Sequence, residues 1–311
     1  MKLEDTPLLK FRSDTVVEVR KELNLDQDAI DKMLQTFEDW IAKQNHFTRK
    51  EFDRHFLETS IVHAKGSLEK AKRTLDKLCT LKTLLPTYFS KCDVKNEFTD
   101  ISVCFVHGTM PDLTKSNYRV YIAKIVSTNI DSELLLDYSR FVVLMSEYAK
   151  IYDYSFGYTC VVDCRDVNIL GFVTKVNVID LRNALSVMME GYGLRINAIY
   201  VISTSKAIDA FVTLLKQVVS HKVSDRIYVL KTVEAIHEHV PKEVLPKDYG
   251  GDQMTLKETN ENWNRVLSEK ENVSYFRSMF AARTNENYRL TATYNDEVLG
   301  MPGSFRTLNV D

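Results

Sequence analysis

The stretch that decides the fold runs from Asn197 to Gly251 and reads NAIYVISTSKAIDAFVTLLKQVVSHKVSDRIYVLKTVEAIHEHVPKEVLPKDYGG. Within it, the apolar run Ala198 to Ile202 has the composition of a β-strand, and Ala207 to Val219 has apolar residues at the period of an amphipathic helix. Ile227 to Leu230 then reads as a second strand, and a loop with Pro and Gly closes the stretch. This order predicts a helix that lies across an apolar sheet, as a lid over an apolar cavity would.

The same alternation of strand and helix extends towards the amino terminus. Tyr118 to Val126 and Gly157 to Val162 are rich in β-branched and aromatic residues, as strands are. Asp131 can cap a helix that runs to about Lys150, and a further helical segment is expected from Val176 to Met189. Alternation at this spacing predicts a mainly parallel sheet with right-handed crossovers, so the expected fold class is α/β.

The residues before Pro86 read as a series of three or four helices. Between Asp28 and Lys43 apolar residues recur at helical period. Thr48 and Glu51 have the spacing of a capping box for the next helix, and a longer helix has to end before the proline. Residues 91–116 show no sustained period and are expected to be a connector.

Length and composition exclude several classes of protein. At 311 residues with 44% hydrophobic side chains, the chain can bury a large core. Its net charge of −2 gives no general attraction to nucleic acid, which is not an expected partner. No apolar run reaches the roughly 20 residues of a membrane span, and the start MKLEDTPLLKFRSD lacks the apolar segment of a secretory signal. We therefore expect a cytoplasmic protein whose five scattered cysteines are reduced.

The sequence contains no recognisable catalytic constellation. No Gly-rich phosphate loop follows a predicted strand, and there is no GxSxG motif. Asp163 and Asp166 lie at a strand end, where carboxylates can act as a base or bind a metal, but where they more often form caps and turns. On a helix, His237 and His239 would point away from each other, unlike a zinc pair. We expect no metal, no cofactor and no enzyme activity, with an α/β enzyme that uses either aspartate as the remote alternative.

The segment Ile236 to Gly251, IHEHVPKEVLPKDYGG, resembles the closing segment of the CRAL-TRIO lipid-binding domain. In that family a Pro, a Leu-Pro pair and an acidic-Tyr-Gly-Gly motif follow one another in this order. The preceding KVSDRIYVL resembles the family's lid exit and strand, and Ser67 to Phe89 resembles part of its amino-terminal helical domain. The ending GSFRTLNVD, Gly303 to Asp311, is similar to that of insect members related to alpha-tocopherol transfer protein.

The resemblance implies an architecture and an activity. It implies a helical domain in residues 1–92, a CRAL-TRIO α/β domain in residues 93–254, and a carboxy-terminal helix and tail in residues 255–311. The implied activity is that of a monomeric cytoplasmic carrier with an apolar cavity and a mobile helical gate. Such a carrier holds one isoprenoid-like molecule, for example a tocopherol, retinoid, carotenoid or terpenoid hormone. It exchanges this ligand during transient peripheral association with membranes that contain phosphoinositides.

The resemblance also implies functional residues. The gate corresponds to Ser205 to Ser220, and basic residues near its end bind phosphoinositide head groups in the family. The matching basic positions are Arg195, Lys222 and Arg226, of which the last two are four apart and would project to one side of a helix. The residues implied to contact the ligand from the gate and the pocket are Ile208, Phe211, Val212, Leu215, Val219, Val187, Met188, Tyr192 and Ile199.

Two departures from the family pattern concern the gate. Ser203-Thr204-Ser205 stands where many relatives have Asn-x-Pro, and Tyr192-Gly193 stands where many have Tyr-Pro or Phe-Pro. The gate therefore lacks prolines that would stiffen it. An alternative function is that of a phospholipid-transfer or phosphoinositide-presenting protein of the same architecture, whose pocket would need polar groups for a buried head group.

Overall fold

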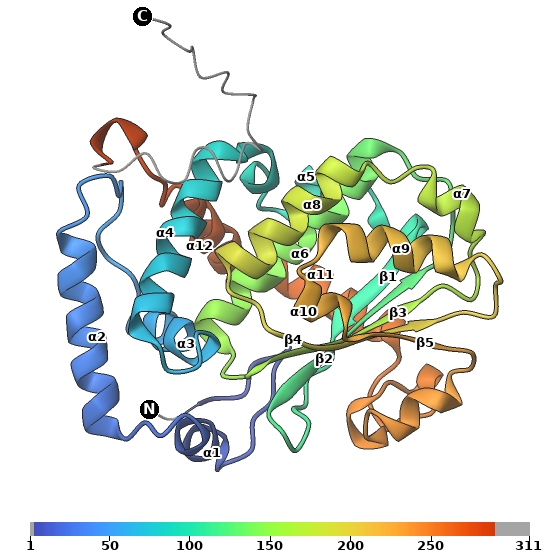
Figure 1. Cartoon of the computed structure of the whole chain (residues 1–311), viewed down its shortest axis with the longest axis horizontal. Helices are drawn as coiled ribbons and strands as arrows, with labels where there is room; N and C mark the ends of the chain where they lie inside the picture. Colours follow the sequence, from blue (N-terminus) through green and yellow to red (C-terminus); the bar gives the residue numbers. More distant parts are fainter. Residues whose placement is uncertain (1–2, 290–311) are drawn as a thin grey trace, which may run out of the picture.

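Helices form the amino-terminal part of the molecule, at one side of the sheet (Figure 1). The computed structural model describes residues 3–289. The ending Gly303 to Asp311, which contributes to the family resemblance, lies outside the described residues. The helices of this part are α1 (Thr15–Glu22), α2 (Gln27–Ala42), α3 (Arg54–His63) and α4 (Leu68–Leu84), followed by the 3-10 helix η1 (Pro86–Phe89).

The start of α3 differs from the prediction. Asp53 caps this helix by accepting a hydrogen bond from the backbone N–H of His55 at 2.7 Å. The predicted capping box of Thr48 and Glu51 is therefore wrong. The Thr48 hydroxyl instead donates to the carbonyl oxygen of Arg283 at 2.9 Å, which ties the helical part to the end of the described chain.

A five-stranded sheet lies at the centre of the remaining chain (Figure 1). Its order is β1-β2-β3-β4-β5; β1 is antiparallel to β2, and the other neighbours are parallel. The α/β fold class with a mainly parallel sheet is confirmed. The strands are β1 (Phe105–Thr109), β2 (Tyr118–Ile125), β3 (Gly157–Asp163), β4 (Ile196–Ile202) and β5 (Ile227–Leu230).

Residues 91–116 are more than the connector that was expected. They contain α5 (Val94–Glu97), the 3-10 helix η2 (Ile101–Val103) and the strand β1. In β1, His107 and Gly108 interrupt the apolar and β-branched pattern by which a strand is recognised in a sequence. Its pairing with β2 compensates for this weak local preference.

Helical crossovers between the parallel strands cover one face of the sheet (Figure 1). Asp131 caps the first of them, as predicted, by accepting a hydrogen bond from the backbone N–H of Leu134 at 2.8 Å. No helix within residues 3–289 is both long enough and apolar enough to cross a membrane. The crossover helices are α6 (Ser132–Tyr152), α7 (Ile169–Val173), α8 (Val178–Ser186) with its π-helical extension η3 (Val187–Gly191), α9 (Ile208–Val218) and α10 (His221–Ser224).

The closing segment, residues 231–255, covers the opposite face of the sheet and is drawn in orange below it in Figure 1. It contains the 3-10 helices η4 (Glu234–Glu238), η5 (Lys242–Val244) and η6 (Lys247–Tyr249). Its apolar side chains pack on the alternate residues of the strands that point to this side. The buried residues of this packing include Val120, Ile122, Val161, Ala198, Ile202, Val233, Ile236, Val240, Val244 and Leu245.

One buried carboxylate ties the closing segment to the sheet. Asp163, at the carboxyl end of β3, accepts a hydrogen bond from the Tyr249 hydroxyl at 2.8 Å and forms an ion pair with Arg165 at 2.8 Å. Burial acts to raise the pKa of Asp163, but hydrogen bonds from Arg165 and Tyr249 outweigh it and lower the pKa. Asp163 is therefore ionised and fully engaged in holding the fold.

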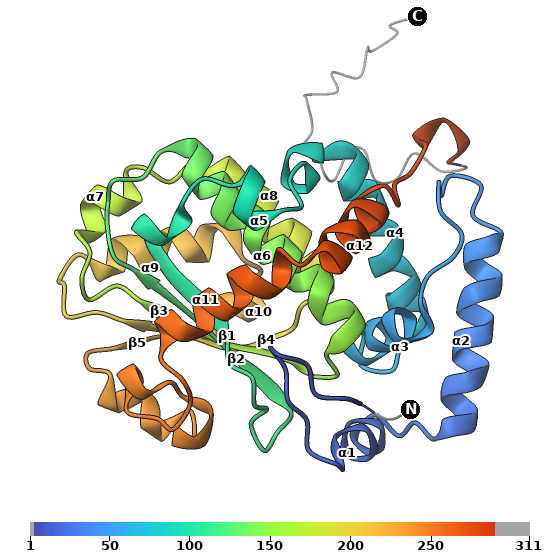
Figure 2. The same ribbon diagram turned by 180° about the vertical axis from the view of Figure 1, so that it is seen from behind.

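Two further helices return across the molecule towards the helical part. α11 (Leu256–Leu267) and α12 (Lys270–Phe280) run diagonally past β1 and α6 (Figure 2), and η7 (Glu286–Tyr288) follows them. The indole N–H of Trp263 donates to the carbonyl oxygen of Thr109 at 3.0 Å. This bond fixes α11 against β1.

We expect Gly251→Ala to destabilise the fold, because an added Cβ would lie 2.1 Å from the carbonyl oxygen of Leu245. The closing segment would have to shift away from the sheet, at a cost of about 1–3 kcal/mol in the free energy of unfolding, which urea denaturation measures. Gly171→Ala in α7 is the control, since its nearest contact, with the Asn168 side chain, would be 3.4 Å. The control should leave stability unchanged or slightly higher. Equal stability of Gly251→Ala and the parent protein would contradict the prediction.

Candidate functional site

A cavity lies between the sheet and the crossover helices, on the face opposite the closing segment. Its volume is about 290 Å³, and most of the side chains around it are apolar. Tyr121, Ala123 and Ile125 of β2 line it, and they alternate with Val120 and Ile122, which pack against the closing segment. The pleat of the sheet thus assigns one set of side chains to a solid core and the other set to the cavity.

A β-bulge widens the contribution of β4 to the cavity wall. The pairing of β3 with β4 shifts in register between Tyr158 and Thr159, and Asn197 is left without a partner in the ladder. Ile196 and Ile199 are an odd number of residues apart, so in a regular strand they would face opposite sides of the sheet. Because of the bulge, both line the cavity.

The lid helix α9 covers the cavity on the side away from the sheet, between α7 and α8 (Figure 1). Phe211, Leu214 and Leu215 of α9 line the cavity. The ring of Phe211 meets the ring of Phe172 in α7 edge to face, with centroids 5.8 Å apart. The contacts of α9 with the rest of the cavity wall are therefore apolar.

The lid differs from the other helices around the cavity in how it begins. Asp131 caps α6 and Asn177 caps α8 through hydrogen bonds to backbone N–H groups. The N-cap residue of α9 is Ala207, whose side chain cannot accept such a bond. The Ser205 hydroxyl accepts a hydrogen bond from the N–H of Ala207 at 3.2 Å, ahead of the helix, so the N–H groups of the first turn of the lid itself receive no side-chain bond.

Five of the predicted ligand-binding residues lie in the cavity wall. Their contact with a ligand remains a prediction. Leu214 also lines the cavity and was missed, although it belongs to the same helix as the predicted gate residues. The five are Phe211, Leu215, Val219, Met188 and Ile199.

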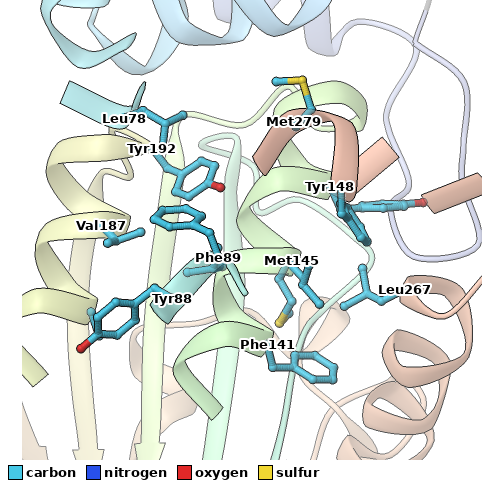
Figure 3. Packing of buried hydrophobic residues seen from close by; sticks show 14 of the residues in the cluster. Leu78, Tyr88, Phe89, Phe141, Met145, Tyr148, Val187, Tyr192, Leu267 and Met279 are labelled. Atoms are coloured by element: carbon cyan, nitrogen blue, oxygen red, sulfur yellow. The ribbon is translucent and has the colours of Figure 1, made fainter. Parts of the chain in front are cut away.

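The other four predicted residues are not among those that line the cavity. Ile208 and Val212 of α9 pack within the hydrophobic core. Val187 and Tyr192 are wholly buried in the core that Figure 3 shows. The Tyr192 hydroxyl donates to Oε2 of Glu147 in α6 at 2.5 Å, which directs its ring into the contact between α6 and the amino-terminal helices.

The backbone of Gly193 accounts for one departure from the family pattern. Its φ is +69°, whereas the ring of proline fixes φ near −65°. A Cβ at this position would also lie 3.0 Å from the side chain of Thr74. The proline that many relatives have after the aromatic residue would not fit this backbone.

Much of the cavity wall comes from residues that the sequence did not assign to the pocket. α6 contributes Tyr138, Val142 and Met145, and α8 contributes Leu181 and Ala184. The apolar stripe of α6 is visible at helical period in the sequence. Such a stripe indicates a buried side, but it does not distinguish a packed core from the border of a cavity.

Three polar side chains form a hydrogen-bonded chain at the cavity. The hydroxyl oxygen of Tyr121 lies 2.8 Å from that of Tyr138 and 3.1 Å from Nδ1 of His107. Burial lowers the pKa of His107 to about 3, and it raises the pKa of both tyrosines, that of Tyr138 to about 12. All three side chains are therefore neutral near pH 7.

Four basic residues, which we call the basic cluster, come together near the end of the lid: Lys65, Arg195, Lys222 and Arg226. Lys65 is exposed, and its pKa is lowered mainly by the positive charges of Arg195 and Lys222. Arg226 contributes to the same effect. Lys65 lies in the turn after α3, so the helical part of the chain adds a cation that the sequence analysis did not assign.

Two arginines of the basic cluster are held by the protein. Nη1 of Arg226 donates to the carbonyl oxygen of Ile196 at 2.6 Å. The guanidinium group of Arg195 lies over the ring of Phe156, 5.5 Å from its centroid. The Nη1 atom of Arg195 is buried and has no hydrogen-bond partner within residues 3–289. The protein thus encloses this atom, and the charge of Arg195 acts on the cluster through its effect on Lys65.

The geometry of the basic cluster differs from what the spacing suggested. Lys222 lies in α10, whereas Arg226 follows that helix and precedes β5. The backbone at Val219 is extended, so α9 ends before either residue. The expectation that Lys222 and Arg226 project from one helix is therefore wrong, and each reaches the cluster from its own segment.

The acidic and histidine residues considered for catalysis have structural partners. Asp163 holds the closing segment, and Asp166 forms an ion pair with Lys124 at 2.6 Å. Nε2 of His237 lies 2.7 Å from the carbonyl oxygen of Tyr249. The part of the chain that the structure describes contains no group of three His, Cys, Asp or Glu side chains that could hold a metal ion.

Three comparisons relate this chain to known proteins. Residues 104–251 match the family model of the CRAL/TRIO domain. The protein named alpha-tocopherol transfer protein-like from Mus musculus is 22% identical over 280 residues, which are 85% of this chain and 77% of that protein. The protein of that name from Homo sapiens is 24% identical over 87 residues, 28% of this chain and 25% of that protein. The crystal structure of Sfh5 aligns with a TM-score of 0.49 at 14% identity, over 85% of this chain and 99% of that one.

We expect Lys222→Ala to raise the pKa of Lys65 towards the ordinary lysine value, because it removes one of the two main positive charges that act on Lys65. NMR titration of lysine side chains with labelled Cε atoms measures this pKa. Lys216→Ala is the matched control, since it removes an exposed charge of α9 that is not among the main influences on Lys65. A pKa of Lys65 that is the same in Lys222→Ala and in the control would show that the cluster does not form.

Proposed function

We propose that this chain, in which residues 104–251 match the CRAL/TRIO domain, carries one hydrophobic small molecule in the cavity beneath α9 and exchanges it at membranes that contain phosphoinositides. Proteins of this family bind and transfer lipids. The observation that carries the proposal is the apolar cavity between the sheet and the lid helix. The residues that line this cavity include no recognisable catalytic constellation that would favour an enzyme over a carrier.

Physical chemistry supports a carrier. Burial of about 300 Å² of apolar ligand surface, at about 25 cal/mol per Å², supplies about 7–8 kcal/mol before the costs of association. Such a ligand needs few polar contacts, which agrees with the scarcity of charged side chains around the cavity. The name of the mouse relative refers to alpha-tocopherol. This favours an isoprenoid-like ligand such as a tocopherol, retinoid, carotenoid or terpenoid hormone.

The surroundings of the lid support exchange at a membrane. We propose that the basic cluster binds a phosphoinositide head group through its four positive charges. Leu170 of α7 and Ile179 of α8 expose 57% and 68% of their surface beside the lid. Exposed apolar side chains beside the start of α9 and a cationic cluster near its end suit a peripheral contact with an anionic membrane surface. A monomeric cytoplasmic protein would make this contact transiently.

A phospholipid-transfer or phosphoinositide-presenting function is the second candidate. Lys175, Asn177 and Asp180 are polar residues that border the cavity at the start of α8. They could contact a head group if the cavity held a phospholipid. The cavity wall has many more apolar side chains than polar ones, and this favours a less polar ligand over a phospholipid.

The cargo itself tests the proposal. Organic extraction of the purified protein, followed by mass spectrometry, should recover one class of isoprenoid-like molecule in near-stoichiometric amount. Recovery of a phospholipid would favour the second candidate. A protein that yields neither and that also fails to bind an apolar dye such as Nile red would contradict a carrier function.

We expect the double variant Lys222→Ala/Arg226→Ala to bind vesicles that contain phosphatidylinositol bisphosphate at least tenfold more weakly, because it removes two charges of the basic cluster. Co-sedimentation with vesicles measures this affinity. The affinity for Nile red should stay nearly constant, since neither residue lines the cavity.

Lys32→Ala/Lys43→Ala is the matched control for this experiment. It removes the same number of positive charges from exposed positions on α2 and at its end, and neither residue belongs to the basic cluster. Its binding to the vesicles should resemble that of the parent protein. Equal losses in the two double variants would mean that net charge, rather than the basic cluster, governs membrane binding.

A further inference from the structure

The polar chain of His107, Tyr121 and Tyr138 stands apart from the apolar remainder of the cavity wall. It joins three elements, since His107 lies in β1, Tyr121 in β2 and Tyr138 in α6. Its two tyrosines line the cavity, whereas His107 is wholly buried behind them. The ring of Phe105 stacks on that of Tyr138 with centroids 4.3 Å apart, which fixes the position of the Tyr138 hydroxyl.

The burial of His107 sets the direction of the hydrogen bonds. Within residues 3–289, Nε2 of His107 has no hydrogen-bond partner, whereas Nδ1 faces the Tyr121 hydroxyl at 3.1 Å. A neutral imidazole carries one proton, and a buried N–H without a partner is rarer in proteins than an acceptor without one. The proton is therefore placed on Nδ1, where it is donated to the oxygen of Tyr121.

The placement of the proton on His107 determines what the O–H groups of Tyr121 and Tyr138 can donate to. Once the oxygen of Tyr121 accepts from His107, its O–H can donate to the oxygen of Tyr138, 2.8 Å away. The O–H of Tyr138 then has no acceptor within the chain of three residues. It can turn towards the space that Tyr138 lines. A buried donor without an acceptor is costly, so the cavity favours a molecule that supplies one.

We propose that the ligand of this cavity carries an acceptor oxygen, such as a ketone, aldehyde, ester or ether, which receives the hydrogen bond of Tyr138 while the apolar remainder lies under α9. This inference rests on the proposed carrier function and narrows it to a class of ligand. The polar end of the ligand lies at the β2 and α6 side of the cavity. His107 and Tyr121 act as positioning residues that orient the Tyr138 donor.

Displacement of Nile red from the purified protein by geranylacetone, an isoprenoid ketone, tests this inference. The reference competitor is the hydrocarbon that has a methylene group in place of its carbonyl. The parent protein should prefer the ketone roughly three- to tenfold, the contribution of one hydrogen bond. Tyr138→Phe, which keeps the ring and removes the donor, should abolish this preference and leave the affinity for the hydrocarbon unchanged.

Tyr158→Phe is the matched control, because Tyr158 also lines the cavity but takes no part in the chain. It should keep the preference for the ketone. Infrared spectroscopy of geranylacetone labelled with carbon-13 at the carbonyl provides a readout that a packing defect would not move. The carbonyl stretch should lie at lower frequency in the parent protein and in the control than in Tyr138→Phe.

Tyr121→Phe tests the direction of the chain. With the proposed direction, Tyr138 still donates to the ketone but loses the bond that orients it, so the preference for the ketone falls. With the opposite direction, Tyr138 would donate to Tyr121, and removal of that oxygen would free the donor and raise the preference. A rise in the preference would therefore overturn the proposed direction.

The outcomes separate this inference from the function on which it rests. Displacement of Nile red by both competitors, with equal affinity in the parent protein and in Tyr138→Phe, would overturn the acceptor-oxygen proposal and leave the carrier function standing. Failure of Nile red and of both competitors to bind would overturn both. Loss of the ketone preference in Tyr138→Phe alone, with the expected shift of the carbonyl stretch, would support the inference.

Discussion

A mainly parallel sheet has two apolar faces, and both have to be kept from water. In this protein the two faces are covered in different ways. The closing segment packs against one face through the buried cluster around Ile122 and Ile236. The crossover helices α6, α8 and α9 cover the other face around a cavity of about 290 Å³. The pleat of each strand thus separates the side chains that pack against the closing segment from those that border the cavity.

The solid face depends on Asp163. Removal of a carboxylate from water is costly unless hydrogen bonds replace the lost hydration, and here Tyr249 and Arg165 provide them. The tyrosine of the acidic-Tyr-Gly-Gly motif therefore has a structural role, and Gly251 lets the backbone pass close to Leu245 beside it. This explains why the most recognisable part of the sequence lies on the side of the sheet away from the cavity.

The sequence was sufficient to predict the elements that have a strong local period. Ile227 to Leu230 was placed at the observed bounds of β5, and the segment from Ala207 to Val219 contains α9. It was insufficient for β1, whose pairing with β2 outweighs the weak pattern around His107. It could not separate Phe211, which lines the cavity, from Val212, which packs in the core, because both belong to one apolar stripe. Electrostatic interactions between distant segments, such as that of Arg195 with Lys65, cannot be read from sequence spacing.

The absence of a side-chain cap at Ala207 has a consequence for how the cavity is reached. Substitution of a capping residue by alanine typically costs a helix about 1 kcal/mol, so the first turn of α9 is less stable than those of α6 and α8. The side-chain bond at this end of the helix is the one from the N–H of Ala207 to the Ser205 hydroxyl at 3.2 Å, so that turn can unwind with little loss while the sheet below and the closing segment stay intact. For the proposed carrier, entry to the cavity would then depend on local fraying of this helix, and the rate of exchange would follow the stability of one turn rather than the stability of the whole fold.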